Sequence, residues 1–197
     1  MAAYIREKKL EQPVIVGHSI GGFLSYLFAI AEPSLPSKVI AVDGLPFLPA
    51  AMNPGATEDS AKAAAEQMKG NLSALDKESF LASTRRTLAT MITDPAKIEV
   101  AAGWASKSDI PSVGQAMYEM LSTDLREKVS AIKAPVLLVG AGSFATTPDL
   151  QQMVLQTYES QVSKIPSHKV ALALKSKHFI MFDDPEFLWK SMDDFLK

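Results

Sequence analysis

Four short runs of apolar residues recur along this chain, and longer stretches with helical periodicity separate them. A continuous apolar run of this length is typical of a strand in a parallel sheet, because helices cover both faces of such a sheet. We therefore predict an α/β fold with a parallel sheet of about four strands flanked by helices. The predicted strands are Val14–Gly17, Ser37–Asp43, Pro135–Gly140 and Lys169–Leu174.

The stretch between the second and third predicted strands carries no strand signal. It contains several helix starts instead, and in one helix Phe80, Leu88 and Met91 recur on a single face. The pattern thus predicts an all-helical insertion between two strands. Its expected helices are Glu58–Lys69, which would end at Gly70, then Lys77–Ile92, a helix from Pro95 through Trp104, and Ser112–Leu121.

Three more helices are expected around the sheet. Residues 2–10 read as a short amphipathic helix before the first strand. Thr147-Pro148 and Asp184-Pro185 each begin a helix, because threonine and aspartate are good N-caps and proline suits the first helical position. The chain thus divides into a core, residues 1–43 and 132–197, and a helical insertion, residues 44–131.

The segment Gly17-His18-Ser19-Ile20-Gly21 directly follows the first predicted strand and leads into an apolar helix. A strand that turns sharply into a helix holds a serine hydroxyl exposed at the apex of the turn. We expect a side chain at position 17 or 21 to clash, because strand and helix pass close together there. The helix N-terminus aims free N–H groups at a developing oxyanion, and Ile20 N–H is the natural donor.

The sequence VIVGHSIGGFLSY resembles the nucleophile elbow of the α/β-hydrolase superfamily, in its esterase and lipase-like branch. The sequence HFIMFDDPEFLWKSMDDFL is similar to the loop with the catalytic histidine and the last helix of that family. The resemblance implies a triad of serine, histidine and acid with Ser19 as the nucleophile. It also implies that residues 44–131 form a cap over the active site. A serine nucleophile argues against the haloalkane dehalogenase branch, which needs a carboxylate there.

Three histidines are candidates for the base that activates Ser19. His18 adjoins Ser19 in a strained turn and is expected to point away from it. His168 lies in a polar link before the fourth strand, where we expect it to be solvated. His178 follows the fourth strand, and functional loops gather at the carboxyl ends of strands in an open parallel sheet. His178 is therefore the predicted base.

The acid of the triad has two candidates. Most relatives carry it shortly after the strand that corresponds to Pro135–Gly140, but no carboxylate follows closely there. Asp149 is the first acid afterwards, and it falls in the first turn of a helix, where an exposed carboxylate is common. Asp43 ends the second strand, a position that some branches of the superfamily use, and enters an apolar loop. A carboxylate there needs a partner such as His178, so Asp43 is preferred and Asp149 is the alternative.

The resemblance covers the whole chain but only roughly the C-terminal two thirds of the family fold, whose earlier strands carry the loop with the second oxyanion donor. We expect either a fragment or a naturally short relative. The first predicted strand is then a sheet edge, and an unpaired apolar edge is a template for strand pairing. We predict a homo-oligomer through this edge or through exchange of the N-terminal helix. In the alternative, residues 1–12 fold over the edge of a monomer.

Composition and charge mainly exclude functions. The formal net charge is −2, so nothing indicates nucleic acid as a partner. Cysteine is absent, which rules out disulfides and cysteine-based metal sites. No apolar run reaches the ~18 residues of a membrane span, and the chain begins with no signal-peptide pattern. We therefore predict a protein without a membrane partner, located in the cytoplasm.

These observations together predict a serine hydrolase of carboxylic esters with small to medium apolar acyl groups. Its site would consist of Ser19, His178 and Asp43, with Ile20 N–H as an oxyanion donor, and it implies no metal or organic cofactor. The alternative is a non-catalytic or weakly active binding or scaffold protein with the same fold, because the usual acid and the second oxyanion donor are missing. Removing one oxyanion donor lowers the rate by on the order of 10²–10³.

Overall fold

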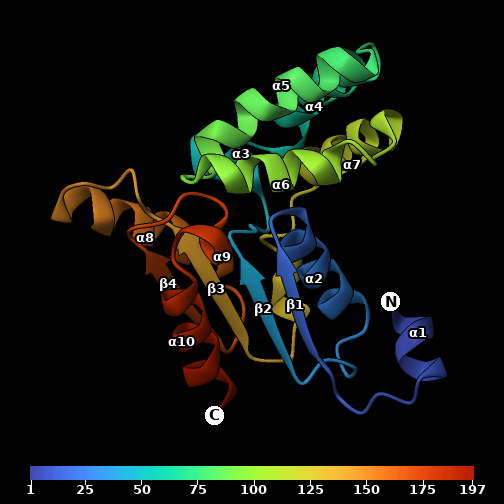
Figure 1. The fold of residues 1–197 in the computed structure, drawn as a ribbon. Helices are drawn as coiled ribbons and strands as arrows, with labels where there is room; N and C mark the ends of the chain where they lie inside the picture. The colour runs from blue at the N-terminus through green and yellow to red at the C-terminus, as the bar shows by residue number, and fades with distance from the viewer.

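The computed structural model describes residues 1–197 and contains one sheet of four parallel strands (Figure 1). The strands lie side by side in the order in which they occur in the chain. This confirms the predicted parallel sheet, and each strand lies close to its predicted position. The strands are β1 (Val14–His18), β2 (Lys38–Val42), β3 (Val136–Ala141) and β4 (His168–Ala173).

Helices cover both faces of the sheet, as the continuous apolar strands predict. On one face, α2 (Ile20–Ala31) packs against β1 and β2, and α8 (Pro148–Val162) packs against β4. On the other face, α10 (Pro185–Leu196) packs against β3 and β4. Both α8 and α10 begin at the predicted pairs, because the side chains of Thr147 and Asp184 accept backbone N–H bonds of the first turn.

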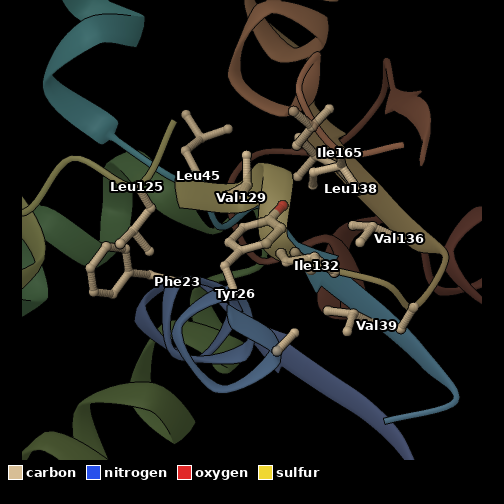
Figure 2. Close-up of a cluster of buried hydrophobic side chains, with 14 of the residues drawn as sticks. Phe23, Tyr26, Val39, Leu45, Leu125, Val129, Ile132, Val136, Leu138 and Ile165 are labelled. Carbon is tan, nitrogen blue, oxygen red and sulfur yellow. The ribbon is translucent and has the colours of Figure 1, made fainter. Parts of the chain in front are cut away.

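Side chains of β2 alternate between the two apolar clusters. Val39 packs with Tyr26 of α2 in the larger cluster (Figure 2), whereas Ile40 packs with Leu188 of α10 in the second. Burying one such side chain contributes about 1.5–3 kcal/mol. Because these two faces are filled from opposite sides, the register of β2 is fixed, and a slip by one residue would exchange every side chain between them.

Five helices fill the predicted insertion between β2 and β3, and Figure 1 shows most of this segment beyond the carboxyl ends of the strands. Four of them begin at a side-chain N-cap, from Thr57, Asp76, Asp94 or Asp109. The helices are α3 (Leu48–Met52), α4 (Glu58–Ser73), α5 (Lys77–Met91), α6 (Pro95–Ala105) and α7 (Ile110–Ser122), and a 3-10 turn, η1 (Lys128–Ala131), leads back to β3.

Some helices differ from the sequence prediction. Helix α4 continues past Gly70 to Ser73, because it packs closely against α7. A Cβ at Gly114 of α7 would lie only 3.3 Å from Lys69 O. This packing outweighs the penalty of about 1 kcal/mol for glycine inside a helix. The sequence pattern also misses α3 and α9 (Ile180–Asp183), which have 5 and 4 residues and so show no periodicity. None of the helices is long and apolar enough to cross a membrane.

Strand β1 is an edge of the sheet, as predicted, and is covered on one face only. Ile15 is buried against Ile5 of α1 (Ala2–Glu7) and against α2. Val14 and Val16 point to the opposite face and remain 39% and 51% exposed. The backbone groups of these two valines also face away from β2, because Pro13 O and Ser19 N make the ladder bonds to the β2 side.

We propose that two copies of the chain associate along this β1 edge, because pairing would satisfy the outward backbone groups and cover the two valines. Light scattering at micromolar concentration should then give a mass above the 21.3 kDa of one chain. Val16→Lys should shift the protein to the monomer. Val100→Lys, which changes an equally accessible apolar residue of α6, should not. A monomeric wild type would show that α1 already protects the edge sufficiently.

Candidate active site

Ser19 occupies a strained turn between β1 and α2. Its φ of 56° and ψ of −121° lie in a region that non-glycine residues rarely adopt, and such a conformation costs about 1–3 kcal/mol. Three backbone hydrogen bonds hold the turn. Ser19 N–H donates to Val42 O at 2.9 Å, and Ser19 O accepts from Gly22 N–H at 2.9 Å and Phe23 N–H at 3.2 Å. The turn therefore has the conformation that the glycine–serine pattern predicts.

Two glycines make this turn possible, but they are not both the predicted ones. A Cβ at Gly17 would lie 2.0 Å from Gly21 O, which confirms the expected clash. A Cβ at Gly21 would meet nothing within 4 Å, so the expected clash at position 21 is wrong. The close approach involves the carbonyl of Gly21 instead of its α-carbon. Gly22 is the crowded position in the helix, because its Cβ would lie 3.0 Å from Gly44 Cα.

His178 and Asp43 meet at the carboxyl end of the sheet. His178 lies in the loop between β4 and α9, and its Nδ1 is 2.6 Å from Asp43 Oδ2. Asp43 directly follows β2 and has a φ of 46°, which aspartate tolerates better than most residues. The structure thus joins the preferred acid to the predicted base across 135 residues of sequence.

Three donors surround the Asp43 carboxylate. In addition to His178, Tyr158 O–H donates to Oδ1 at 2.5 Å, and Ala141 N–H donates to the same oxygen at 2.9 Å. Burial raises the pKa of this carboxyl, but the hydrogen bonds from His178, Tyr158 and Ala141 outweigh burial and hold the pKa below its ordinary value. Asp43 is therefore ionised at neutral pH.

His18 also belongs to the site, although it is not the predicted base. Its Nε2 lies 3.0 Å from His178 O, and the two imidazole rings are 4.6 Å apart. Burial, followed by the neighbouring His178, lowers the pKa of His18, so the ring is neutral at pH 7. A neutral ring facing a carbonyl must carry its proton on Nε2, and His18 therefore donates to the backbone of His178.

The remaining candidates lie elsewhere. Asp149 is exposed in the first turn of α8 and makes no hydrogen bond with a histidine. His168 begins β4 and thus lies at the opposite end of the sheet from His178. Contrary to expectation, His168 is half-buried. Its Nδ1 bonds Ile165 O at 2.7 Å, and its Nε2 lies 3.3 Å from Glu159 Oε2.

The loop that carries His178 is fixed to the helical insertion. Lys177 Nζ donates to the carbonyls of Ala89 and Ile92 at the end of α5. Asp183 accepts hydrogen bonds from Lys177 N–H and from the N–H and hydroxyl of Thr93. Lys177 and Asp183 are not among the residues predicted from the sequence, because an isolated lysine or aspartate in a loop carries no pattern that distinguishes it from a solvated residue.

A cavity of about 460 Å³ opens beside the His178–Asp43 pair, and its lining includes Tyr158, Lys177, Thr90 and Ser143. Ser19 is not among its lining residues, and no hydrogen bond joins Ser19 Oγ to His178. Another cavity, of about 500 Å³, lies between α4 and α5 and is lined by residues such as Met68 and Leu72. The chain has no cluster of three or more histidine, cysteine or acidic side chains that could hold a metal ion.

Comparisons with known proteins agree with this fold. Residues 2–190 match the sequence model described as the Alpha/beta hydrolase family, whereas no curated protein matches the chain. Among solved structures, a bromoperoxidase from Bacillus anthracis gives a TM-score of 0.71 at 17% identity, over 99% of this chain and 71% of that one. MenH from S. aureus gives a TM-score of 0.70 at 17% sequence identity, over 98% of this chain and 71% of that one. An esterase from Exiguobacterium antarcticum gives a TM-score of 0.69 at 16% sequence identity, over 98% of this chain and 69% of that one.

The two elbow glycines give a matched test of the turn. Gly17→Ala should lower the free energy of unfolding by about 3 kcal/mol or more, because the new methyl group overlaps the Gly21 carbonyl and backbone there cannot shift easily. Gly21→Ala should stay within about 1 kcal/mol of the wild type and can be slightly more stable, because alanine favours a helix. Urea denaturation measures both values. Equal destabilisation by the two substitutions would contradict the described turn.

Proposed function

Because this chain belongs to the alpha/beta hydrolase family, and because membership in that family supports hydrolase activity in general, we propose that it is a serine hydrolase of carboxylic esters with small to medium apolar acyl groups. The observation that carries the proposal is the hydrogen bond of 2.6 Å between His178 Nδ1 and Asp43 Oδ2. This pair lies at the same end of the sheet as the strained turn of Ser19, since Ser19 N–H bonds the carbonyl of Val42, the residue before Asp43.

In the proposed reaction, Ser19 Oγ attacks the ester carbonyl carbon while His178 Nε2 takes the hydroxyl proton. Asp43 accepts the Nδ1 proton in a hydrogen bond, which leaves Nε2 free to act as a base and stabilises the imidazolium. The oxyanion accepts a hydrogen bond from Ile20 N–H, since the first N–H of a helix has no acceptor inside the helix. His178 then protonates the leaving alcohol, and water hydrolyses the acyl-enzyme through the same groups.

Apolar side chains in the cavity beside His178 support an apolar acyl group, since Phe144 and Ala141 are among its lining residues. We further propose that residues 44–131 act as a cap, because their helices lie beyond the carboxyl ends of the strands (Figure 1). The structural likeness to a protein named an esterase fits an ester as substrate.

A second candidate function is a non-catalytic or weakly active binding or scaffold protein with this fold. Two observations favour it: Ser19 Oγ has no hydrogen bond with His178, and the cavity beside His178 does not reach Ser19. In a hydrolase that hydrogen bond would have to tighten when substrate binds, as catalytic contacts often do.

Hydrolysis of a series of p-nitrophenyl esters decides between the two functions. The wild type should hydrolyse the short and medium acyl esters, and Ser19→Ala should reduce kcat by on the order of 10³-fold or more, because it removes the nucleophile. Ser130→Ala serves as the control and should keep the kcat of the wild type, since Ser130 is exposed before β3 and its hydroxyl bonds only Glu127 O. A fluorophosphonate probe should label the wild type and not Ser19→Ala. Absence of labelling on folded wild type would favour the scaffold.

The identity of the acid can be tested separately. Asp43→Asn should keep the fold and lower kcat by on the order of 10³–10⁴-fold, because the imidazolium loses its stabilising charge and the histidine tautomer is no longer fixed. Asp149→Asn should leave kcat unchanged and reduce stability by less than about 1 kcal/mol, through the helix dipole alone. Kinetics and thermal unfolding of both variants provide the measurement, and the reverse ranking would transfer the role to Asp149.

A further inference from the structure

Tyr158 lies in the C-terminal half of α8, and its ring packs against Gly140 near the end of β3. A Cβ on Gly140 would lie 2.3 Å from Cε1 of the tyrosine ring. The ring can therefore lie near the carboxyl end of the sheet, in the space that a side chain at position 140 of β3 would otherwise occupy. This contact brings a residue of α8 against the end of β2 as well as that of β3.

The tyrosine hydroxyl binds one oxygen of Asp43, and His178 binds the other. Tyr158 O–H lies 2.5 Å from Oδ1, whereas His178 Nδ1 lies 2.6 Å from Oδ2. Ala141 N–H also donates to Oδ1, at 2.9 Å. Two donors on Oδ1 restrain rotation of the carboxylate, and in this orientation Oδ2 faces His178 Nδ1.

The chemical state of the tyrosine suits this contact. Burial, together with the nearby Asp43 charge, raises the pKa of the Tyr158 hydroxyl above its ordinary value. The hydroxyl thus stays protonated and donates to the carboxylate at every pH at which a serine hydrolase works. A hydrogen bond between a neutral hydroxyl and a buried carboxylate is among the stronger ones in proteins.

We propose that Tyr158 is a positioning residue that orients Asp43 toward His178 and thereby sets the activity of the site. Its hydroxyl bonds Asp43 and neither Ser19 nor His178, so its effect on the reacting groups passes through the carboxylate. Gly140 is the second part of the arrangement, because it provides the room for the ring. This inference rests on the proposed function for its kinetic consequence, but the geometry it concerns exists whether or not the protein turns over an ester.

The kinetic test compares Tyr158→Phe with Tyr26→Phe. Both changes remove one hydroxyl from a largely buried tyrosine, but Tyr26 donates to Gly44 O at 3.3 Å and not to Asp43. Tyr158→Phe should reduce kcat for p-nitrophenyl esters about 10- to 100-fold with KM nearly unchanged, the effect of losing one hydrogen bond to a charged group. Tyr26→Phe should retain the kcat of the wild type. Equal kcat in Tyr158→Phe and the wild type would overturn the proposal.

A double variant separates positioning from a general effect on the fold. If Tyr158 acts through Asp43, Tyr158→Phe should have little further effect on kcat in the Asp43→Asn background, where the charge to be oriented is gone. Additive losses in the double variant would instead indicate a structural role away from the acid, and would overturn the inference. Thermal unfolding of each variant should show that all are folded at the assay temperature.

A spectroscopic readout keeps the inference testable even if the protein hydrolyses no ester. The His178 Nδ1 proton in a short hydrogen bond to Asp43 should give a proton NMR signal far downfield, which Asp43→Asn removes and thereby assigns. In Tyr158→Phe this signal should broaden or shift, whereas Tyr26→Phe should leave it in place. An unchanged signal in Tyr158→Phe overturns the positioning role. Failure of the wild type to hydrolyse esters or to react with fluorophosphonate would instead overturn the proposed function.

Discussion

The hydrogen bond from Ser19 N–H to Val42 O is the interaction on which the rest of the site depends. It extends the β1–β2 ladder by one residue beyond the last paired strand residues, and so sets Ser19 beside Asp43. A second bond of the same kind, from Asp43 N–H to Val139 O, extends the ladder toward β3. Both residues have a positive φ, and such strain persists only where the surroundings over-determine the backbone. The parallel sheet therefore stabilises two strained residues at its carboxyl edge.

Hydrogen bonds on both sides of His178 connect the histidine loop to the helical insertion. Lys177 bonds the last carbonyls of α5 on one side of His178, and Asp183 binds Thr93 on the other. The lysine ammonium at a helix C-terminus also complements the negative end of the helix dipole. A shift of α5 would thus be transmitted to His178, whereas Asp43 is attached to the sheet.

Much of the fold could be predicted from the sequence, because four apolar strands and several capped helices are local patterns. The contact of Asp43 with His178 was also within reach, since both follow parallel strands and must lie at one edge. The role of Tyr158 could not be predicted, because the sequence shows only an ordinary aromatic residue in a helix, and its partner Asp43 is 115 residues away. The wrong prediction at Gly21 has a similar origin: a motif gives the spacing of glycines, but only the three-dimensional structure shows which atom makes the close approach.

The two histidines at the site, His18 and His178, have different hydrogen-bond partners and therefore different proposed roles. His18 is half-buried and its ring bonds only a backbone carbonyl. Burial and the neighbouring His178 lower its pKa, and they outweigh the opposing effect of the Asp43 charge. His178 faces an ionised Asp43 at 2.6 Å, so a proton that it accepts is matched by an opposite charge. If His18 were charged, it would repel an imidazolium at His178, since the rings are 4.6 Å apart. A neutral His18 thus supports the histidine loop without opposing the charge that the proposed reaction must develop on His178.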